Sequence, residues 1–284
     1  MTVSARRAYR LAYDGAAYRG FQRQPDVLTV SDAILDALRD LDIADSGVPP
    51  GYAAAGRTDA GVSAVAQTVS LTAPDWLDPA AFNSELPADI RAWAHAPVGP
   101  DFHATHAATA REYTYYLFAP EADESRAQTA LESLSGRHDF HNLTPDERGT
   151  VRTLSGRLEK DDQVLQITVR AGGFPRQLVR RLVTVIERIA TGTADSDFVA
   201  DVLGTEARTG PEGIPPAPPE PLVLTGVDYP NVTFDVHPEA AASAQAEFGR
   251  RRAQHTARSR VAGRILTEID NDEASSTTAG DEQP

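Results

Sequence analysis

Residues 55–62 read Ala-Gly-Arg-Thr-Asp-Ala-Gly-Val, a loop of small residues that holds one carboxylate and one guanidinium. Gly56 and Gly61 allow the backbone to turn sharply and a ligand to approach it closely. An aspartate on such a loop can act as a nucleophile or a general base, and a neighbouring arginine favours its ionised form. A turn with an Asx hydrogen bond and a surface arginine explains the same residues. The composition of the loop alone favours this simpler interpretation.

The segments on either side of the loop alternate between strand-like and helix-like patterns. Residues 7–13, 64–71, 112–118 and 222–229 have strand character, and residues 150–159 and 163–171 form a predicted hairpin. Residues 31–41 predict a helix capped by Ser31, and Pro74 and Pro79 predict a loop after the strand 64–71. A second helix is predicted by apolar residues at helical spacing, namely Phe174, Leu178, Leu182, Ile186 and Ile189. The pattern as a whole predicts an α+β fold with a mostly antiparallel sheet and flanking helices.

Proline content and charge divide the C-terminal part of the chain. Residues 211–221 are rich in proline and predict an extended loop. Residues 238–264 are rich in alanine and arginine and predict a helical extension, whereas the acidic residues 265–284 predict a disordered tail. We expect the remainder to form two α+β halves, an N-terminal one (1–100) that carries the aspartate loop and a C-terminal one (101–237).

The chain is strongly acidic. It holds 41 Asp and Glu residues against 27 Lys and Arg, which gives a formal net charge of −14, and Lys160 is the sole lysine. This balance argues against a general nucleic-acid binder, although it is compatible with a local arginine site. Such a composition also suggests a cytoplasm at very high salt, where repulsion between like charges is screened.

Residue types that are absent exclude several classes of protein. Because the sequence holds no cysteine, it has no disulfide scaffold, thiol nucleophile or Cys-ligated zinc. No apolar run approaches the roughly 20 residues of a membrane span, and the N-terminal residues lack the apolar stretch of a signal peptide. We therefore expect a cytoplasmic protein without membrane contact.

Several further strings occur in a fixed order around the aspartate loop. They are YDGAAYRGFQRQ (13–24), GRTDAGV (56–62), LPADIRAW (86–93), DFHAT (101–105), AREYTY (110–115), GRHDF (136–140) and FPRQLVRRLV (174–183). In these strings the chain closely resembles the TruA family of tRNA pseudouridine synthases, from about residue 10 to residue 230. The resemblance implies the pseudouridine synthase fold, with two similar halves around a catalytic cleft.

The resemblance also implies roles for four residues. The family's catalytic carboxylate corresponds to Asp59, and the arginine that pairs with it corresponds to Arg180. Tyr113 corresponds to the tyrosine that packs against the target base, and Leu222 to the leucine that lines the pocket. Attack at C1′ of the ribose, base-initiated elimination and addition to C6 are the three routes open to Asp59.

The chain departs from the family's usual residues at three positions. Ser63 replaces a histidine, Thr105 replaces an arginine, and Pro221 replaces the glycine before the pocket leucine. None of these changes removes the carboxylate or its arginine partner. The RNA contacts usually assigned to these positions are not carried over to this chain.

Family membership would make tRNA the substrate and a homodimer the active form. The reaction would isomerise uridine to pseudouridine at positions 38, 39 and 40 of the anticodon stem-loop, after the base is flipped out. It would need no cofactor and no metal. The candidates for RNA binding are Arg57, Arg19, Arg23, Gln22 and Arg176. A solvated surface is the competing explanation for each of them.

Two other functions fit parts of the sequence. A non-catalytic tRNA-binding or folding protein on the same scaffold would agree with the three departures, although the carboxylate and its partners remain. A zinc-dependent hydrolase would use the histidine pairs at positions 103/106 and 138/141. The sequence has no HExxH motif and no clustered carboxylate beside these pairs, which argues against a metal site.

Overall fold

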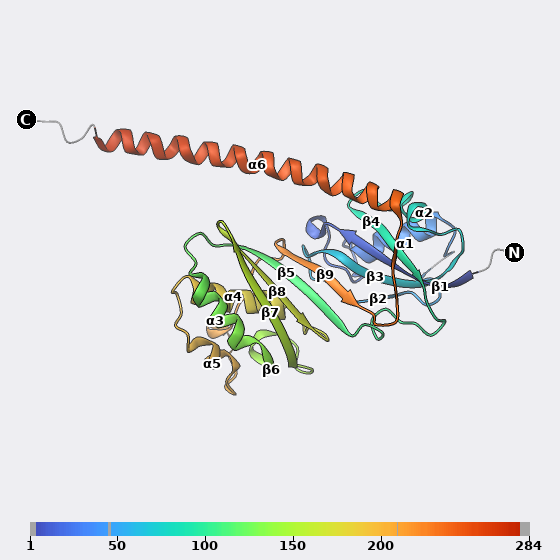
Figure 1. Cartoon of the computed structure of the whole chain (residues 1–284), viewed down its shortest axis with the longest axis horizontal. Coiled ribbons are helices and arrows are strands. Elements are labelled where there is room, and N and C mark those ends of the chain that lie inside the picture. Colours follow the sequence, from blue (N-terminus) through green and yellow to red (C-terminus); the bar gives the residue numbers. More distant parts are fainter. Residues whose placement is uncertain (1–3, 45–46, 209, 279–284) are drawn as a thin grey trace, which may run out of the picture. The chain divides into compact units, whose positions relative to one another are not determined.

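A computed structural model describes residues 4–44, 47–208 and 210–278, with side chains through residue 269 (Figure 1). The chain divides into two compact units, Met1–Ala241 and Ala242–Pro284. Among the described residues, no helix combines the length and the apolar character that a membrane span requires.

The described part of the first unit is built on one ten-stranded sheet with the order β10-β4-β1-β3-β9-β5-β8-β7-β6, and β2 pairs with β3 beside this path. The strands are β1 (Ser4–Tyr13), β2 (Ala53–Ala54), β3 (Ser63–Pro74), β4 (Ile90–Pro97), β5 (Ala110–Phe118), β6 (Gly136–Asp139), β7 (Val151–Asp161), β8 (Val164–Ala171), β9 (Leu222–Asp228) and β10 (Asp235–Val236). The pairing of β3 with β9 is parallel, and the other pairings within this sheet are antiparallel. The predicted α+β class with a mostly antiparallel sheet is confirmed.

Helices cover this sheet and complete the first unit. They are α1 (Val30–Asp40), α2 (Pro79–Asn83), α3 (Glu124–Leu134), α4 (Leu178–Ala190) and α5 (Phe198–Leu203), with single 3₁₀ turns at Gly15–Ala17, His141–Leu143 and Gly210–Glu212. The helix α2 contacts β4, α3 contacts β7, and α4 contacts β5 (Figure 1). The buried faces of these helices join the apolar side chains of the strands in one core.

The two halves of the sheet share one order of elements. In the first half, β1 is followed by α1, β3, α2 and β4, and β1 pairs antiparallel with both later strands. In the second half, β5 is followed by α3, the hairpin β7–β8, α4 and β9, and β5 again pairs with the later strands β8 and β9. The halves meet where β3 and β9 begin side by side, with Ser63 opposite Val223 and Ala64 opposite Leu224.

Three helix boundaries differ from those that the sequence predicts. Helix α1 begins at Val30 because Thr29, not Ser31, accepts a hydrogen bond from the backbone N–H of Asp32. Pro79 does not close a loop but occupies the first turn of α2, where its missing N–H costs nothing. The second predicted helix begins at Leu178, so Phe174 lies before it.

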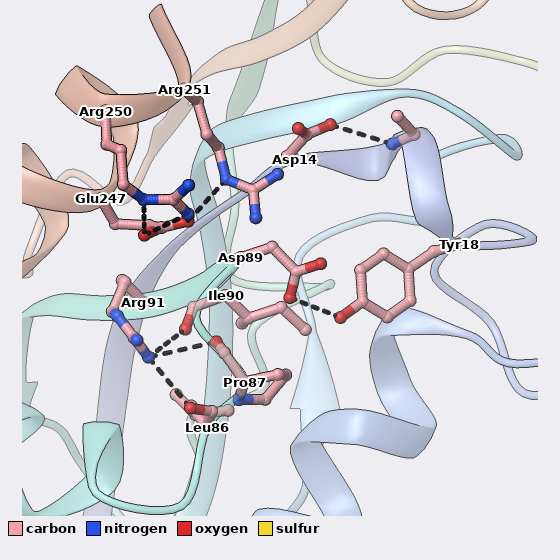
Figure 2. A network of polar contacts seen from close by, with 11 residues as sticks. Asp14, Tyr18, Leu86, Pro87, Asp89, Ile90, Arg91, Glu247, Arg250 and Arg251 are labelled. Atoms are coloured by element: carbon pink, nitrogen blue, oxygen red, sulfur yellow. Dashed lines mark hydrogen bonds and ion pairs between the residues drawn. The ribbon is translucent and has the colours of Figure 1, made fainter. Parts of the chain in front are cut away.

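The C-terminal helix α6 (Pro238–Thr278) forms most of the second unit. The helix continues past residue 264, so the disordered tail expected from residue 265 is wrong as far as Thr278, and residues 279–284 lie outside the described part. Charged pairs along one face stabilise it, since Glu247 accepts hydrogen bonds from Arg250 and Arg251 at 2.7 Å each, as Figure 2 shows. Such pairs within a helix contribute about 0.2–0.5 kcal/mol each.

Candidate active site

The loop 55–62 connects β2 to β3 and is fixed by its own backbone. The N–H of Ala55 donates to the carbonyl of Thr68 at 2.8 Å, and the carbonyl of Thr58 accepts from Phe21 N–H at 3.0 Å. The N–H of Gly61 donates to the carbonyl of Tyr18 at 3.3 Å. The YDGAAYRGFQRQ segment therefore lies against the loop and holds its backbone in place.

A chain of polar contacts anchors that supporting segment in turn. The hydroxyl of Tyr18 donates to Asp89 Oδ1 at 2.8 Å, a contact visible in Figure 2. Asp89 belongs to the LPADIRAW string, in which Arg91 donates to the backbone carbonyls of residues 86, 87 and 90 (Figure 2). Motif residues far from the aspartate loop thus contribute to its position through hydrogen bonds.

Buried polar side chains of the neighbouring strands β1 and β3 also hold the loop in place. The hydroxyls of Tyr13 and Thr58 are 2.8 Å apart, and Gln67 Nε2 donates to the carbonyl of Gly56 at 2.9 Å. Burial raises the pKa of Tyr13 well above its ordinary value, so its hydroxyl stays protonated. These side chains were not among the predicted site residues, since a Tyr and a Gln on strands carry no sequence signal for a buried loop contact.

Two glycines beside the loop adopt left-handed backbone conformations. Gly61 has a φ of +83°, and a Cβ there would lie 2.9 Å from Cγ of Pro219. Gly20 has a φ of +95°, and a Cβ there would lie 3.0 Å from the carbonyl oxygen of Thr58. A larger residue at either position would strain the backbone and press on the segments that hold the loop.

Asp59 is paired with Arg180, as the resemblance implies. The NH1 group of Arg180 donates to Asp59 Oδ2 at 3.2 Å across 121 residues of sequence. Arg180 also donates from Nε to the carbonyl of Ala217 at 2.6 Å, and its own carbonyl accepts from Ala217 N–H at 3.1 Å. The side chain of Arg180 is 12% exposed and that of Asp59 is 32% exposed. A fixed guanidinium therefore holds the carboxylate while leaving it open to a ligand.

Tyr113 lies on β5 and is almost fully buried. Its ring packs edge-to-face on Phe174, with 5.2 Å between the ring centroids. Burial raises the pKa of Tyr113 to about 12, and the negative charge of Asp59 adds to this effect while Arg111 opposes it. The side chain is therefore a neutral phenol at physiological pH, able to donate a hydrogen bond.

Leu222 is the buried first residue of β9 and pairs with Tyr115 of β5. The segment before it reaches both other parts of the site, because Ala217 binds Arg180 and Pro219 lies against Gly61. Residues from the loop, β5, α4 and the start of β9 thus border one region at the junction of the two halves.

The five predicted RNA-binding residues differ in their surroundings. Arg57, Arg19 and Gln22 are exposed, and no ion pair of these two arginines occurs within residues 4–44, 47–208 and 210–269. Arg23 is paired with Asp32 at 2.7 Å. Arg176 binds Asp146 through Nε at 2.5 Å and through its backbone N–H at 2.9 Å. Within the described residues, Arg57 and Arg19 thus present positive charge without an ion pair and Gln22 presents a neutral amide, whereas Arg23 and Arg176 are partly neutralised.

The three departures from the family pattern have structural contacts. Ser63 Oγ accepts a hydrogen bond from Gly15 N–H at 3.1 Å. Thr105 Oγ1 donates to the carbonyl of Ala54 at 2.5 Å, directly before the aspartate loop. The carbonyl of Pro221 accepts from Tyr116 N–H at 3.2 Å. Each of these residues therefore has a role in the scaffold around the site.

The histidine pairs do not gather with other ligands in the described part of the chain. His103 and His106 stack with ring centroids 4.3 Å apart. His141 lies 3.6 Å from Asp139, and His138 packs on Phe140. No group of three or more His, Cys, Asp or Glu side chains suited to a metal ion occurs in residues 4–44, 47–208 and 210–269.

Comparison with known proteins finds relatives that match most of the chain. A family model described as tRNA pseudouridine synthase matches residues 130–230. The tRNA pseudouridine synthase A of Halobacterium salinarum (strain ATCC 29341 / DSM 671 / R1) is 55% identical over 264 residues, which cover 92% of this chain and 99% of that protein. That of Natronomonas pharaonis is 56% identical over 262 residues, which cover 91% and 98%. That of Methanosarcina acetivorans is 40% identical over 227 residues, which cover 78% and 84%.

These matches differ in how much of the chain they include. Because 92% of the 284 residues is more than the 241 of the first unit, the match with Halobacterium salinarum extends into the second unit. The first two relatives come from halophilic archaea, which agrees with the acidic composition of this chain. Among solved structures, a Cbf5-Nop10-Gar1 complex covers 64% of this chain and 44% of the matched chain, at 12% identity and a TM-score of 0.35.

Proposed function

Because this chain belongs to the family of tRNA pseudouridine synthase A, we propose that it is an isomerase that converts uridine to pseudouridine in the anticodon stem-loop of tRNA, at positions 38, 39 and 40. The observation that carries the proposal at the level of the site is the ion pair between Asp59 and Arg180 at the junction of the two halves. The pair joins the most distinctive loop of the sequence to the start of α4.

The reaction conserves every atom of the nucleoside. The bond between C1′ and N1 breaks, the uracil turns, and a new bond forms between C1′ and C5. The C5 proton leaves and N1 gains a proton, so no oxidant, reductant or group donor is consumed. The enzyme must supply a carboxylate, a pocket that retains the detached base, and groups that move protons.

Asp59 is the carboxylate in this proposal. It attacks C1′, removes the proton that starts an elimination, or adds to C6, and each route needs its ionised form. Arg180 donates a charge-assisted hydrogen bond to Oδ2 of this carboxylate. Because Arg180 is itself bound to Ala217, the carboxylate is oriented before substrate arrives, which lowers the cost of reaching the reactive geometry.

Tyr113 and Leu222 form the walls against which the base turns. The ring of Tyr113 packs on the uracil, and its neutral hydroxyl relays a proton. The raised pKa favours the neutral phenol over a phenolate as the resting form of Tyr113. Leu222 limits the access of water to the detached base, because it is buried and apolar.

Removing only the hydroxyl of Tyr113 tests the proton relay. Tyr113→Phe keeps the ring and its contact with Phe174, so tRNA affinity should be unchanged while kcat falls by roughly 100-fold. Release of tritium from C5 of uridine-labelled tRNA measures the rate. Tyr116→Phe, on the same strand but 47% exposed, is the matched control and should retain wild-type kcat. Equal rates for Tyr113→Phe and wild type would contradict the proton relay and show that Tyr113 contributes only the packing of its ring.

Recognition of the target requires that its base leave the helical stack. Flipping costs a few kcal/mol, which contacts to phosphates can offset. Arg57 lies two residues from Asp59 and is exposed, and Arg19 and Gln22 belong to the segment that supports the loop. These three residues are our candidates for phosphate contacts, and Arg23 and Arg176 would first have to exchange a carboxylate for RNA.

Pseudouridine mapping in cellular tRNA tests the proposed function directly. tRNA from cells with and without this protein is compared at each uridine of the anticodon stem-loop. We expect pseudouridine at positions 38, 39 and 40 to disappear in the deletion and to return when purified protein is added. Unchanged modification at all three positions would contradict the anticodon specificity. Loss of pseudouridine at other positions instead would show that the enzyme modifies those positions.

The assembly and the compartment follow from the same proposal. We expect a homodimer, which sedimentation of the full chain in concentrated salt would reveal, and a cytoplasmic location with its substrate. A non-catalytic tRNA-binding role gains no support, because the three departures from the family pattern have scaffold contacts and Asp59 keeps its partner.

A further inference from the structure

Arg111 binds four backbone carbonyls with the two terminal nitrogens of its guanidinium. NH2 donates to Ala55 and Thr105 at 2.7 Å each. NH1 donates to Gly172 at 2.7 Å and to Ala108 at 3.2 Å. Each terminal nitrogen carries two N–H groups, so all four of these donors are used.

The four carbonyls come from three segments that surround Asp59 and Tyr113. Ala55 is the first residue of the aspartate loop. Thr105 and Ala108 belong to the connection that precedes β5, and Gly172 belongs to the connection between β8 and α4, the helix that supplies Arg180. One side chain thus joins the segments that present the carboxylate and its arginine partner.

Arg111 and Tyr113 also share one face of β5. Side chains two residues apart on a strand point to the same side, and the regular pairing with β8 sets Arg111 opposite Ala171 and Tyr113 opposite Val169. The strand that presents Tyr113 therefore carries, one step along the same face, the group that grips the loop of Asp59.

We propose that Arg111 is a positioning residue that sets the location of Asp59 relative to Tyr113. The inference rests on the proposed function and adds to it a residue that touches neither the substrate nor the reacting atoms. We call Arg111 and its four carbonyl partners the clamp. The clamp ties together the aspartate loop, the strand that carries Tyr113 and the segment that leads into α4. A displacement of about 1 Å in such a constellation can lower a rate by about 100-fold.

Lysine cannot replace arginine in this clamp. Its ammonium is a point charge with three donors on a flexible stem, whereas the guanidinium presents its donors in a flat fork. A lysine would keep the positive charge and reach one or two of the four carbonyls. Arg111→Lys therefore separates the geometry of the clamp from its charge.

The test compares Arg111→Lys with Arg126→Lys in the full-length protein. Arg126 is the control because its guanidinium also binds a backbone carbonyl, that of Ala194 at 3.0 Å, and it lies on α3, outside the segments that hold the aspartate loop. We expect Arg111→Lys to lower kcat for tritium release by about 100-fold with the Kd for tRNA unchanged. Arg126→Lys should retain kcat even if the melting temperatures of the two variants fall equally.

The outcomes distinguish the clamp from general stability. Equal kcat values for the two variants, or a loss in Arg111→Lys that appears only as weaker tRNA binding, would overturn the proposal. If Arg111→Lys does not fold, Arg111→Gln is the second variant, because its neutral amide leaves no buried charge unpaired and has donors for at most two of the four carbonyls. It should lower kcat in the same direction, and an unchanged kcat would also overturn the proposal. Activity of the wild-type protein in the same assay shows that a failure of the clamp is not a failure of the proposed function.

Discussion

Asp59→Asn should lower the rate of pseudouridine formation by about 10⁴-fold or more, which corresponds to about 5.5 kcal/mol of lost transition-state stabilisation. Asparagine has almost the size of aspartate and can still accept a hydrogen bond from Arg180 NH1. It lacks the negative charge, so it can neither attack C1′ nor remove a proton. Release of tritium from C5 in a single turnover, with enzyme in excess, measures the step directly.

Binding of tRNA separates this effect from misfolding. Asp59 is held within the loop by backbone contacts of its neighbours, which the asparagine leaves in place, so the Kd for tRNA and the melting temperature should change little. Asp36→Asn is a matched control, because it also removes a carboxylate bound to an arginine, on the surface of α1. Turnover by Asp59→Asn at more than a few per cent of the wild-type rate would refute the role of Asp59.

The parts of the fold that sequence patterns predict well are those in which burial imposes a period. Leu165, Ile167 and Val169 alternate because one face of β8 is buried, and the hairpin with β7 follows the pattern. The pattern cannot locate the start of a helix when a capping hydrogen bond or a proline determines it. Thr29 and Ser31 are equally suitable caps by composition, and Phe174 continues the spacing of α4 although Pro175 disfavours a helical conformation before it.

Side-chain pairing over long sequence distances limited the prediction of the site. The pair of Asp59 and Arg180 was expected only because of the family resemblance. No sequence pattern indicates that Arg176 meets Asp146, so the sequence predicts a charge available to RNA where the structure has an ion pair. The contacts of Arg111 could not be predicted for a different reason. Its partners are backbone carbonyls, which every residue carries, so no residue type in the sequence marks them as partners.

Arg180→Lys is expected to lower kcat by about 100-fold. Arg180 performs two tasks with separate nitrogens, since Nε binds Ala217 and NH1 binds Asp59. A lysine ammonium cannot reach both in this geometry, and a charge-assisted hydrogen bond contributes about 1.5–3 kcal/mol, a factor of about 10–150 in rate. Arg188→Lys in the last turn of the same helix should retain wild-type kcat. A normal rate in Arg180→Lys would mean that charge alone suffices at this position.

A double-mutant cycle decides whether Arg180 acts through Asp59. The free energy of unfolding is measured for wild type, Asp59→Asn, Arg180→Lys and the double variant. If the two side chains interact as the 3.2 Å contact indicates, the double variant should lose less free energy of unfolding than the sum of the losses in the two single variants. We expect this difference to be about 1 kcal/mol. The carboxylate is about one-third exposed, so screening keeps this coupling below that of a fully buried pair, and molar salt should reduce it further. Additive effects would assign the loss of rate in Arg180→Lys to its broken contact with Ala217, because that contact does not involve the carboxylate.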